Sequence, residues 1–179
     1  EPRGRKETDT PRPVSPYAAS KLGAELCAAQ YRDCYDVDLV VARPFNHVGP
    51  GQSPRFVVPS FVQKLEAVRR GERDAIVEMG NLSAVRDFSH VADVVEAYIL
   101  LLERGESGET YNVCSETERS IERALQEILQ SSGVHAEIRS KAGKPRPTDL
   151  AHLVGDGSKL RRLGFAPKRH PFEGLFPQP

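Results

Sequence analysis

The stretch Ser15-Pro16-Tyr17-Ala18-Ala19-Ser20-Lys21 places a tyrosine and a lysine four residues apart, at the start of a segment that should be helical. Five alanines and evenly spaced apolar side chains predict a helix over residues 17–35. Four residues turn an α-helix through about 400°, so both side chains lie on one face. A phenol titrates near pH 10 in water, and a neighbouring ammonium group lowers its pKa. The pair therefore suits an acid/base acting on a carbonyl or an alcohol, although Tyr-x-x-x-Lys alone also fits a surface lysine beside a half-buried tyrosine.

Strand and helix signals alternate along the rest of the chain. Short apolar runs predict strands over residues 38–43, 74–79, 110–113 and 136–140. Amphipathic segments predict helices over residues 57–70, 91–103, 120–131 and 158–163. Proline and glycine predict loops over residues 1–16, 44–55 and 141–149. Strands that alternate with helices indicate an α/β fold.

The composition excludes several classes of function. Lysine plus arginine and aspartate plus glutamate each number 25, so nothing favours binding to nucleic acid or to an anionic membrane. No apolar run approaches the roughly 20 residues that span a bilayer. The three cysteines and the scattered histidines lack metal-ligand spacing, which predicts no metal site. The cysteines are typical of small buried side chains in a reducing compartment, so a cytoplasmic protein is expected.

Five blocks of sequence carry a resemblance to a known family. They are Thr10-Pro11-Arg12-Pro13-Val14-Ser15-Pro16-Tyr17-Ala18-Ala19-Ser20-Lys21, Arg43-Pro44-Phe45-Asn46-His47-Val48-Gly49-Pro50-Gly51-Gln52, Gly80-Asn81-Leu82-Ser83-Ala84-Val85-Arg86-Asp87-Phe88, Tyr111-Asn112-Val113-Cys114-Ser115 and Arg146-Pro147-Thr148-Asp149. In this order, and over nearly the whole chain, they resemble the extended short-chain dehydrogenases/reductases that act on nucleotide sugars. The resemblance implies a doubly wound, Rossmann-like parallel sheet with a small α/β substrate-binding lobe.

The same resemblance implies that only the C-terminal part of such an enzyme is present. The family binds its dinucleotide through a glycine-rich turn, where the backbone can approach the pyrophosphate, and this sequence has no such turn. The family's catalytic serine or threonine would also lie upstream. We expect residues 1–56 to complete the Rossmann domain and residues 57–179 to form mostly the substrate-binding lobe, with 86–113 returning to the Rossmann sheet. Apolar side chains of the first helix should then be exposed, and the isolated chain should be poorly soluble or dimeric.

The resemblance assigns chemical roles to four residues near the predicted active site. Tyr17 would be the general acid, and Lys21 would lower the pKa of the phenol and hold the nicotinamide ribose, so both would contact NADP or NAD. Arg43 and Pro44 would shape the loop beside the nicotinamide. Relatives often pair through the helix that carries the tyrosine, so a homodimer is expected for the intact protein.

A second set of residues would bind the nucleotide sugar. By resemblance these are Asn46, Val57, Asn81, Arg86, Arg146 and Asp149. A guanidinium group can grip phosphate oxygens bidentately, which suits Arg86 and Arg146 to the substrate diphosphate. Arg86 could instead form a surface ion pair with Asp87, worth about 0–1 kcal/mol. Relatives tend to carry glutamate at the position of Asp149, which leaves the contact of the shorter aspartate open.

Three readings of the function remain open at this point. The loop after Asn46 resembles that of reductases acting on GDP-4-keto-6-deoxymannose, which implies reduction of a C4 ketone by NADPH or NADH, with a GDP-sugar as the substrate. A GDP-mannose 4,6-dehydratase or another nucleotide-sugar epimerase is the first alternative. A non-catalytic remnant that binds a nucleotide sugar is the second.

Overall fold

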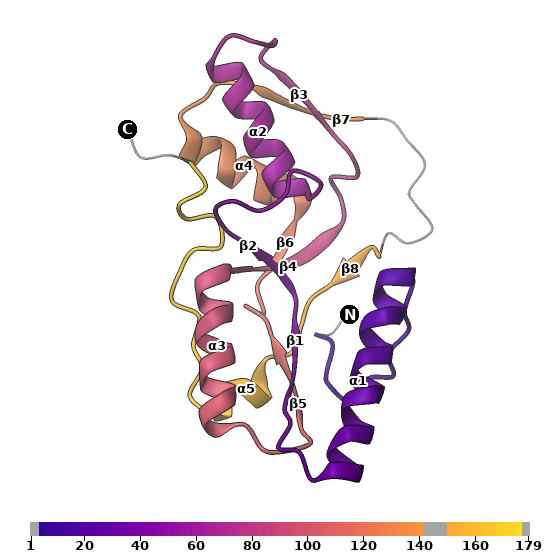
Figure 1. Cartoon of the computed structure of the whole chain (residues 1–179). Coiled ribbons are helices and arrows are strands. Elements are labelled where there is room, and N and C mark those ends of the chain that lie inside the picture. The colour runs from indigo at the N-terminus through magenta and orange to yellow at the C-terminus, as the bar shows by residue number, and fades with distance from the viewer. Residues whose placement is uncertain (1–3, 142–149, 177–179) are drawn as a thin grey trace.

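The computed structural model describes residues 4–141 and 150–176 as an α/β protein (Figure 1). In chain order the elements are α1 (Pro16–Tyr35), β1 (Val41–Pro44), β2 (Asn46–Val48), α2 (Val57–Arg69), β3 (Ile76–Met79), β4 (Val85–His90), α3 (Val91–Arg104), β5 (Thr110–Val113), β6 (Glu118–Ser120), α4 (Ile121–Ser132), β7 (Glu137–Ser140), β8 (His152–Leu153) and α5 (Ser158–Arg162).

Side chains and a glycine at the helix ends explain where α1 begins and where α4 begins and ends. The Ser15 hydroxyl accepts the amide of Ala18 at the start of α1, and the Ser120 hydroxyl accepts the amide of Arg123 at the start of α4. These side chains satisfy amides that have no partner inside the helix. At the end of α4, Gly133 adopts φ 67°, a left-handed conformation that glycine tolerates best.

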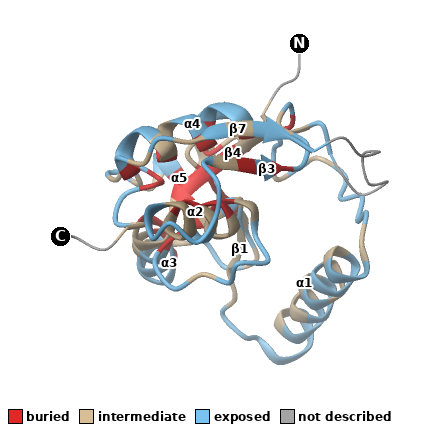
Figure 2. Ribbon diagram, turned by 90° about the horizontal axis from the view of Figure 1, so that it is seen from above, coloured by how far each residue is buried: buried red, intermediate tan, exposed pale blue. Residues whose placement is uncertain are grey.

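The first sheet is a parallel pair of strands, β1 and β5, with helices on both sides. Val41 pairs with Thr110 and Pro44 with Val113. Ala42 packs with α3 on one face, whereas the side chain of Arg43, its neighbour in β1, reaches α1 on the other face. Figures 1 and 2 show α1 and α3 on opposite sides of β1.

A central sheet lies next to this pair, and the sequence predicted none of its strands. β2 runs parallel to β4, which also pairs with antiparallel β6 and with parallel β8. The prediction of a loop throughout residues 44–55 was therefore wrong at β2. β4 shows no apolar run because four of its six residues are polar or charged, namely Arg86, Asp87, Ser89 and His90. β2, β6 and β8 have only two or three residues each, too few to show a period.

Two hydrophobic cores hold the molecule together. The larger core joins α2 and α4 to the central sheet and to the parallel pair β3 and β7, and includes the fully buried Phe61, Leu65 and Leu125. The smaller core joins α3, β5 and α5, with Tyr111 and Leu160 at its centre. Each fully buried side chain of this kind contributes about 1.5–3 kcal/mol relative to an exposed one. Phe172 belongs to the larger core, so the C-terminal segment after α5 runs from one core to the other.

Two helices keep apolar side chains in solvent, as predicted for the first helix. None of the residues of α1 is buried (Figure 2). Leu26 of this helix is 64% exposed. α3 exposes a second apolar stripe, in which Leu102 is 88% exposed. None of the described helices is both long enough and apolar enough to cross a bilayer.

We expect these two stripes to make the chain self-associate. Exposed apolar patches of this kind seek a partner. Sedimentation velocity should show species larger than the monomer, and the double variant Leu26→Glu with Leu102→Glu should shift the population toward the monomer. The paired variant Glu66→Gln with Glu122→Gln, which leaves both stripes intact, should change nothing. A wild-type chain that sediments as a monomer at all concentrations would contradict this expectation.

The three thiols should differ sharply in reactivity. Cys27 and Cys34 are exposed on α1, so the expectation of buried cysteines was wrong for these two. Cys114 is buried, and its burial raises the pKa of its thiol. The thiolate is the reactive species, so Cys114 should react only after unfolding. Titration with Ellman's reagent should therefore release two equivalents rapidly from the native chain and the third only in denaturant. Rapid release of all three equivalents from folded protein would contradict the buried position of Cys114.

Candidate active site

The predicted acid/base pair lies on the first two turns of α1. Because α1 is continuous from Pro16 to Tyr35, Tyr17 and Lys21 share one face of the helix. Tyr17 is 73% exposed and Lys21 is exposed too. The backbone carbonyl of Tyr17 accepts the Ser20 hydroxyl at 2.8 Å. Neither the phenol nor the ammonium group has a hydrogen-bond or ion-pair partner among residues 4–141 and 150–176, so both remain available to a ligand.

An ion pair fixes how α1 lies against β1. Glu25 follows Lys21 by one turn, and its carboxylate receives the Arg43 guanidinium at 2.6 Å (Nη2) and 3.0 Å (Nε). Arg43 also donates to the carbonyl of Glu7 at 3.1 Å. The hydrogen bond to Glu25 raises the pKa of Arg43. Because Tyr17, Lys21 and Glu25 follow one another at intervals of four residues, this bond sets the rotation of α1 and thus the direction of the acid/base pair. The sequence suggested that Arg43 shapes a loop, and its partner on α1 was not foreseen.

Asn112 of β5 holds the N-terminal segment against this strand through hydrogen bonds. Its backbone amide donates to the Glu7 carboxylate at 2.9 Å, and its side-chain amide donates to the carbonyls of Arg5 and Asp156 at 2.8 and 3.2 Å. The side chain of Asn112 is buried, and each of these bonds joins segments distant in sequence. Sequence reasoning missed this residue, although a polar residue inside an apolar strand was the signal.

The residues predicted to bind the nucleotide sugar occupy the central sheet and the start of α2. Asn46 begins β2 and is exposed, and it pairs with Phe88 of β4, two residues beyond Arg86. Arg86 is half-buried and donates to the carbonyl of Val85 at 2.8 Å. Val57 is the half-buried first residue of α2. The structure therefore brings Asn46 and Arg86 onto neighbouring strands.

The remaining predicted positions lie at the edge of this group or outside it. Asn81 is exposed, and its Oδ1 accepts the amide and the hydroxyl of Ser83 at 3.0 and 2.8 Å, which closes a turn. Pro44 ends β1 and is exposed. Arg146 and Asp149 lie outside the described residues.

Asp87 is a structural carboxylate, and the alternative of a surface ion pair with Arg86 is wrong. Its side chain is 0% exposed. It accepts four bonds, from the amide and hydroxyl of Ser115 at 2.8 and 2.7 Å and from the amides of Glu116 and Gly155 at 2.9 and 3.3 Å. Burial raises the pKa of Asp87, and the hydrogen bonds from Ser115 and Gly155 partly offset that rise. The carboxylate thus ties β4 to the connection after β5 and to the chain that follows β8.

The donor set of the site suits an organic cofactor better than a metal. Within the part of the chain that the structure describes, no three His, Cys, Asp or Glu side chains gather as metal ligands would. The exposed phenol and ammonium groups of α1 fit the hydroxyls and carbonyls of a dinucleotide and a sugar.

Comparison with known proteins agrees with this arrangement. A family model described as GDP-mannose 4,6 dehydratase matches residues 1–176. GDP-6-deoxy-D-mannose reductase of Pseudomonas aeruginosa is 36% identical over 159 residues, which are 88% of this chain and 52% of that enzyme. Human dTDP-D-glucose 4,6-dehydratase is 30% identical over 174 residues, 94% of this chain and 48% of that enzyme.

Solved structures give the same result for the fold. The structure of RMD from Pseudomonas aeruginosa complexed with NADPH superimposes with a TM-score of 0.85 at 34% identity, over 90% of this chain and 54% of that chain. DesIV, a dTDP-glucose 4,6-dehydratase from Streptomyces venezuelae with NAD and TYD bound, gives 0.82 at 28% identity, over 97% of this chain and 52% of that chain. The chain therefore spans about half the length of these relatives. The predictions of an α/β, Rossmann-like fold and of the nucleotide-sugar branch are confirmed, and the chain belongs to the GDP-mannose 4,6-dehydratase family.

Proposed function

We propose that this chain supplies the proton donor and the substrate-binding surface of an NAD(P)-dependent nucleotide-sugar reductase. Its substrate would be a GDP-4-keto-6-deoxyhexose, reduced at the C4 ketone. The observation that carries the proposal is the exposed Tyr17–Lys21 pair on α1, held in direction by the bond between Glu25 and Arg43. The 36% identity to GDP-6-deoxy-D-mannose reductase supports the choice of reaction.

In this mechanism Tyr17 gives its proton to the C4 oxygen of the sugar. NADPH or NADH, when bound, supplies the hydride that reduces the ketone. Lys21, one turn along α1, favours the phenolate that remains after proton transfer and can also hold the ribose of the cofactor. Glu25 is paired with Arg43, so its carboxylate does not compete for the Lys21 ammonium group.

The central sheet would hold the nucleotide end of the substrate. Arg86 offers a permanent positive charge and a planar fork for the diphosphate. Asn46, on the neighbouring strand, offers an amide to the same group. Arg146 and Asp149 remain proposed contacts of the diphosphate and of a nucleotide ribose, and Val57 and Asn81 remain proposed parts of the wall.

A 4,6-dehydratase is the second candidate, because the matching family model and two of the relatives carry that description. Both reactions need a tyrosine and a lysine placed as here. They differ in the further acid/base that a dehydratase needs to remove water from C5 and C6. Product analysis of the intact enzyme separates them, since a dehydratase turns over GDP-mannose whereas a reductase consumes the 4-keto sugar and NAD(P)H.

Binding of GDP tests the substrate side of the proposal in the chain itself. Calorimetry should show saturable binding of GDP, with weaker binding of UDP and dTDP. We expect Arg86→Ala to weaken GDP binding by about tenfold or more, because a charge-assisted bidentate contact contributes about 1.5–3 kcal/mol.

Arg70→Ala is the matched control for this variant. Arg70 is an exposed arginine paired with Glu72, so its loss should leave GDP affinity unchanged. Equal weakening by both variants, or no binding of GDP to the wild-type chain, would contradict the proposed substrate surface. Binding of GDP with an unreactive Tyr17 in the intact enzyme would favour the non-catalytic remnant.

A further inference from the structure

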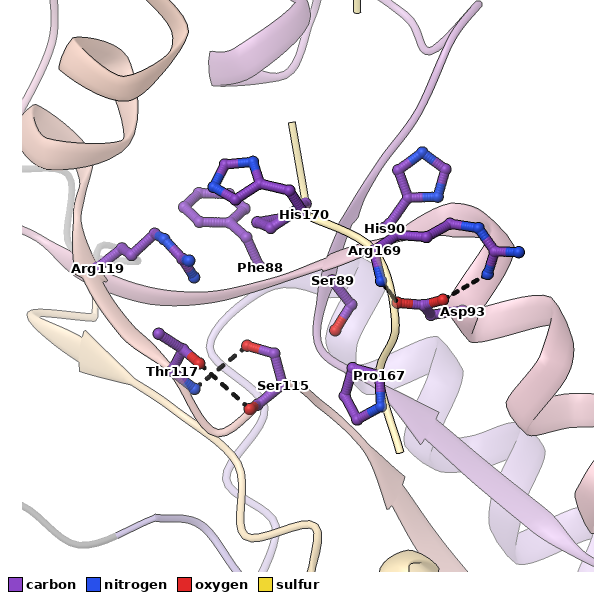
Figure 3. Close-up of a pocket in the computed structure, with 11 residues that line it drawn as sticks. Phe88, Ser89, His90, Asp93, Ser115, Thr117, Arg119, Pro167, Arg169 and His170 are labelled. Atoms are coloured by element: carbon purple, nitrogen blue, oxygen red, sulfur yellow. Dashed lines mark hydrogen bonds and ion pairs between the residues drawn. The ribbon is translucent and has the colours of Figure 1, made fainter. Parts of the chain in front are cut away.

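A cavity of about 340 Å³ lies beside the junction of β4 and α3. Three segments form it: the junction of β4 and α3, the connection from β5 to β6, and the C-terminal segment around residues 167–171. Figure 3 shows the polar side chains that line it, which include Ser89, Ser115, Thr117, Arg119, Arg169 and His170. Its volume falls within the range of small-molecule sites. Figures 1 and 2 place α3 on the opposite side of β1 from α1, so this cavity is separate from the site around Tyr17.

Ser89 brings an unsatisfied hydroxyl to this cavity. The residue is only 6% exposed, and its side chain lines the cavity (Figure 3). No hydrogen bond to the Ser89 hydroxyl forms within the part of the chain that the structure describes. The hydroxyl is open to the cavity, so it can donate to a ligand or a water molecule there.

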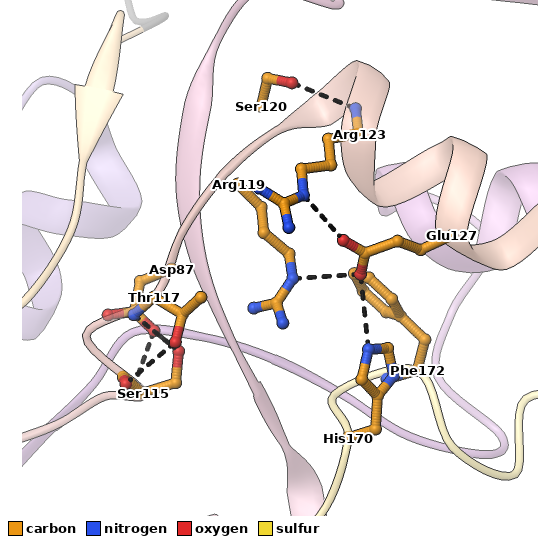
Figure 4. A network of polar contacts seen from close by, with 9 residues as sticks. All are labelled: Asp87, Ser115, Thr117, Arg119, Ser120, Arg123, Glu127, His170 and Phe172. Carbon is orange, nitrogen blue, oxygen red and sulfur yellow. Dashed lines mark hydrogen bonds and ion pairs between the residues drawn. The ribbon is translucent and has the colours of Figure 1, made fainter.

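Arg119 brings to the cavity a guanidinium group of which only one nitrogen has a hydrogen-bond partner. Its side chain is 12% exposed, and only Nε has a partner, the Glu127 carboxylate at 3.1 Å (Figure 4). The guanidinium group lies over the ring of Phe172, 6.0 Å from the centroid, which limits its movement. Neither terminal nitrogen has a partner among the described residues. The N–H groups of both nitrogens are therefore available to a ligand. Such a fork matches two oxygens of a phosphate or a carboxylate.

The carboxylates around the cavity are already engaged. Asp93 accepts the amides of Lys168 and Arg169, each at 3.0 Å, and the Arg169 guanidinium at 2.6 Å. Glu127 faces Arg119, Arg123 and His170 (Figure 4). The four donors described above satisfy Asp87. The groups that remain open toward the cavity are therefore mostly donors, and the ligand must be an acceptor.

We propose that this cavity is a second binding site, for a small oxyanion of the phosphate class. The terminal nitrogens of Arg119 would bind two of its oxygens, and the Ser89 hydroxyl would donate to a third. Arg169 and His170 also line the cavity, but both are already paired with carboxylates. The site does not depend on the proposed reductase activity.

Nuclear magnetic resonance of the whole chain tests the proposal with inorganic phosphate as the probe. Phosphate should shift the amide signals of Ser89, Thr117 and Arg119, and saturate below about 10 mM. Arg119→Leu should weaken this binding at least about tenfold, and Ser89→Ala about threefold. A hexose phosphate that binds more tightly than inorganic phosphate at the same signals would identify a phosphate monoester as the ligand. Tighter inorganic phosphate would identify the free ion.

Arg123→Leu is the matched control, because Arg123 binds the same Glu127 carboxylate but does not line the cavity. It should change phosphate affinity less than twofold. Equal loss in Arg119→Leu and Arg123→Leu would show a general charge effect and overturn the proposal. Shifts confined to Asn46 and Asn81, or no saturation in the wild-type chain, would overturn it too. Ser89→Ala removes a single unpartnered hydroxyl, so it keeps the test decisive if Arg119→Leu fails to fold.

Discussion

Tyr17→Phe is expected to lower the rate of ketone reduction by about 10²–10⁴-fold in a protein that joins this chain to an NADPH-binding half. Phenylalanine keeps the ring and removes only the proton that the sugar oxygen would receive, and general acid catalysis contributes a factor of this size. This chain matches about half of the Pseudomonas aeruginosa reductase. The other half of that enzyme, which this chain does not match, is a suitable fusion partner. Consumption of NADPH with the 4-keto sugar gives the rate.

The control for this experiment is Tyr31→Phe on the same helix. Tyr31 is exposed, its ring centroid lies 5.4 Å from that of Tyr35, and its hydroxyl has no part in the proposed chemistry. Its rate should equal that of the parent fusion. A Tyr17→Phe protein that retains the full rate while binding both ligands would exclude Tyr17 as the proton donor.

Asp87→Ala is expected to lower the free energy of unfolding by about 3–5 kcal/mol, the largest effect on stability among the polar residues. The variant leaves two Ser115 donors and two further amides without their acceptor, in a half-buried to buried position. Each unsatisfied buried group costs about 1–3 kcal/mol before relaxation. Urea denaturation of the chain measures it. Asp33→Ala, at an exposed aspartate on α1, should change stability by no more than about 0.5 kcal/mol.

The same carboxyl group should give stability a pH dependence of known sign. Burial raises the pKa of Asp87 above its value in the unfolded chain, so the folded state holds the proton longer. Stability from this group is then greatest at low pH and falls as the pH rises from the unfolded to the folded pKa. Asp87→Asn should remove this part of the pH profile. A profile unchanged by Asp87→Asn would show that the pKa of Asp87 does not differ between the two states.

The sequence predicted the elements whose pattern is local. Periodic apolar residues placed two helices within a residue of α2 and α3, at 57–70 and 91–103. The strand β4 could not be predicted in this way, because Asp87 is buried by virtue of donors that lie at least 28 residues away in the chain. The polar residues of β4 give no strand pattern, because the hydrogen-bond donors that make burial of Asp87 possible come from other segments of the chain.

In the candidate site, too, the sequence predicted the local arrangement of residues but not the contacts between distant segments. Tyr17 and Lys21 are four residues apart on one helix, so their shared face followed from the spacing. The bond from Arg43 to Glu25 spans 18 residues, and the bond from Asn112 to Glu7 spans 105. Contacts of this kind depend on how strands and helices assemble, which no local pattern records.

The two-stranded pair of β1 and β5 has a wider consequence for the proposed enzyme. Among the described residues β1 pairs only with β5, so its other edge offers unpaired amides and carbonyls. The helices on either side of β1, α1 and α3, also expose apolar side chains. A polypeptide that adds a strand at this edge would also cover the helix on which the phenol stands. Joining the two halves and completing the catalytic pocket would then be one event, and the enzyme could be reconstituted by complementation in the same way as a split reporter.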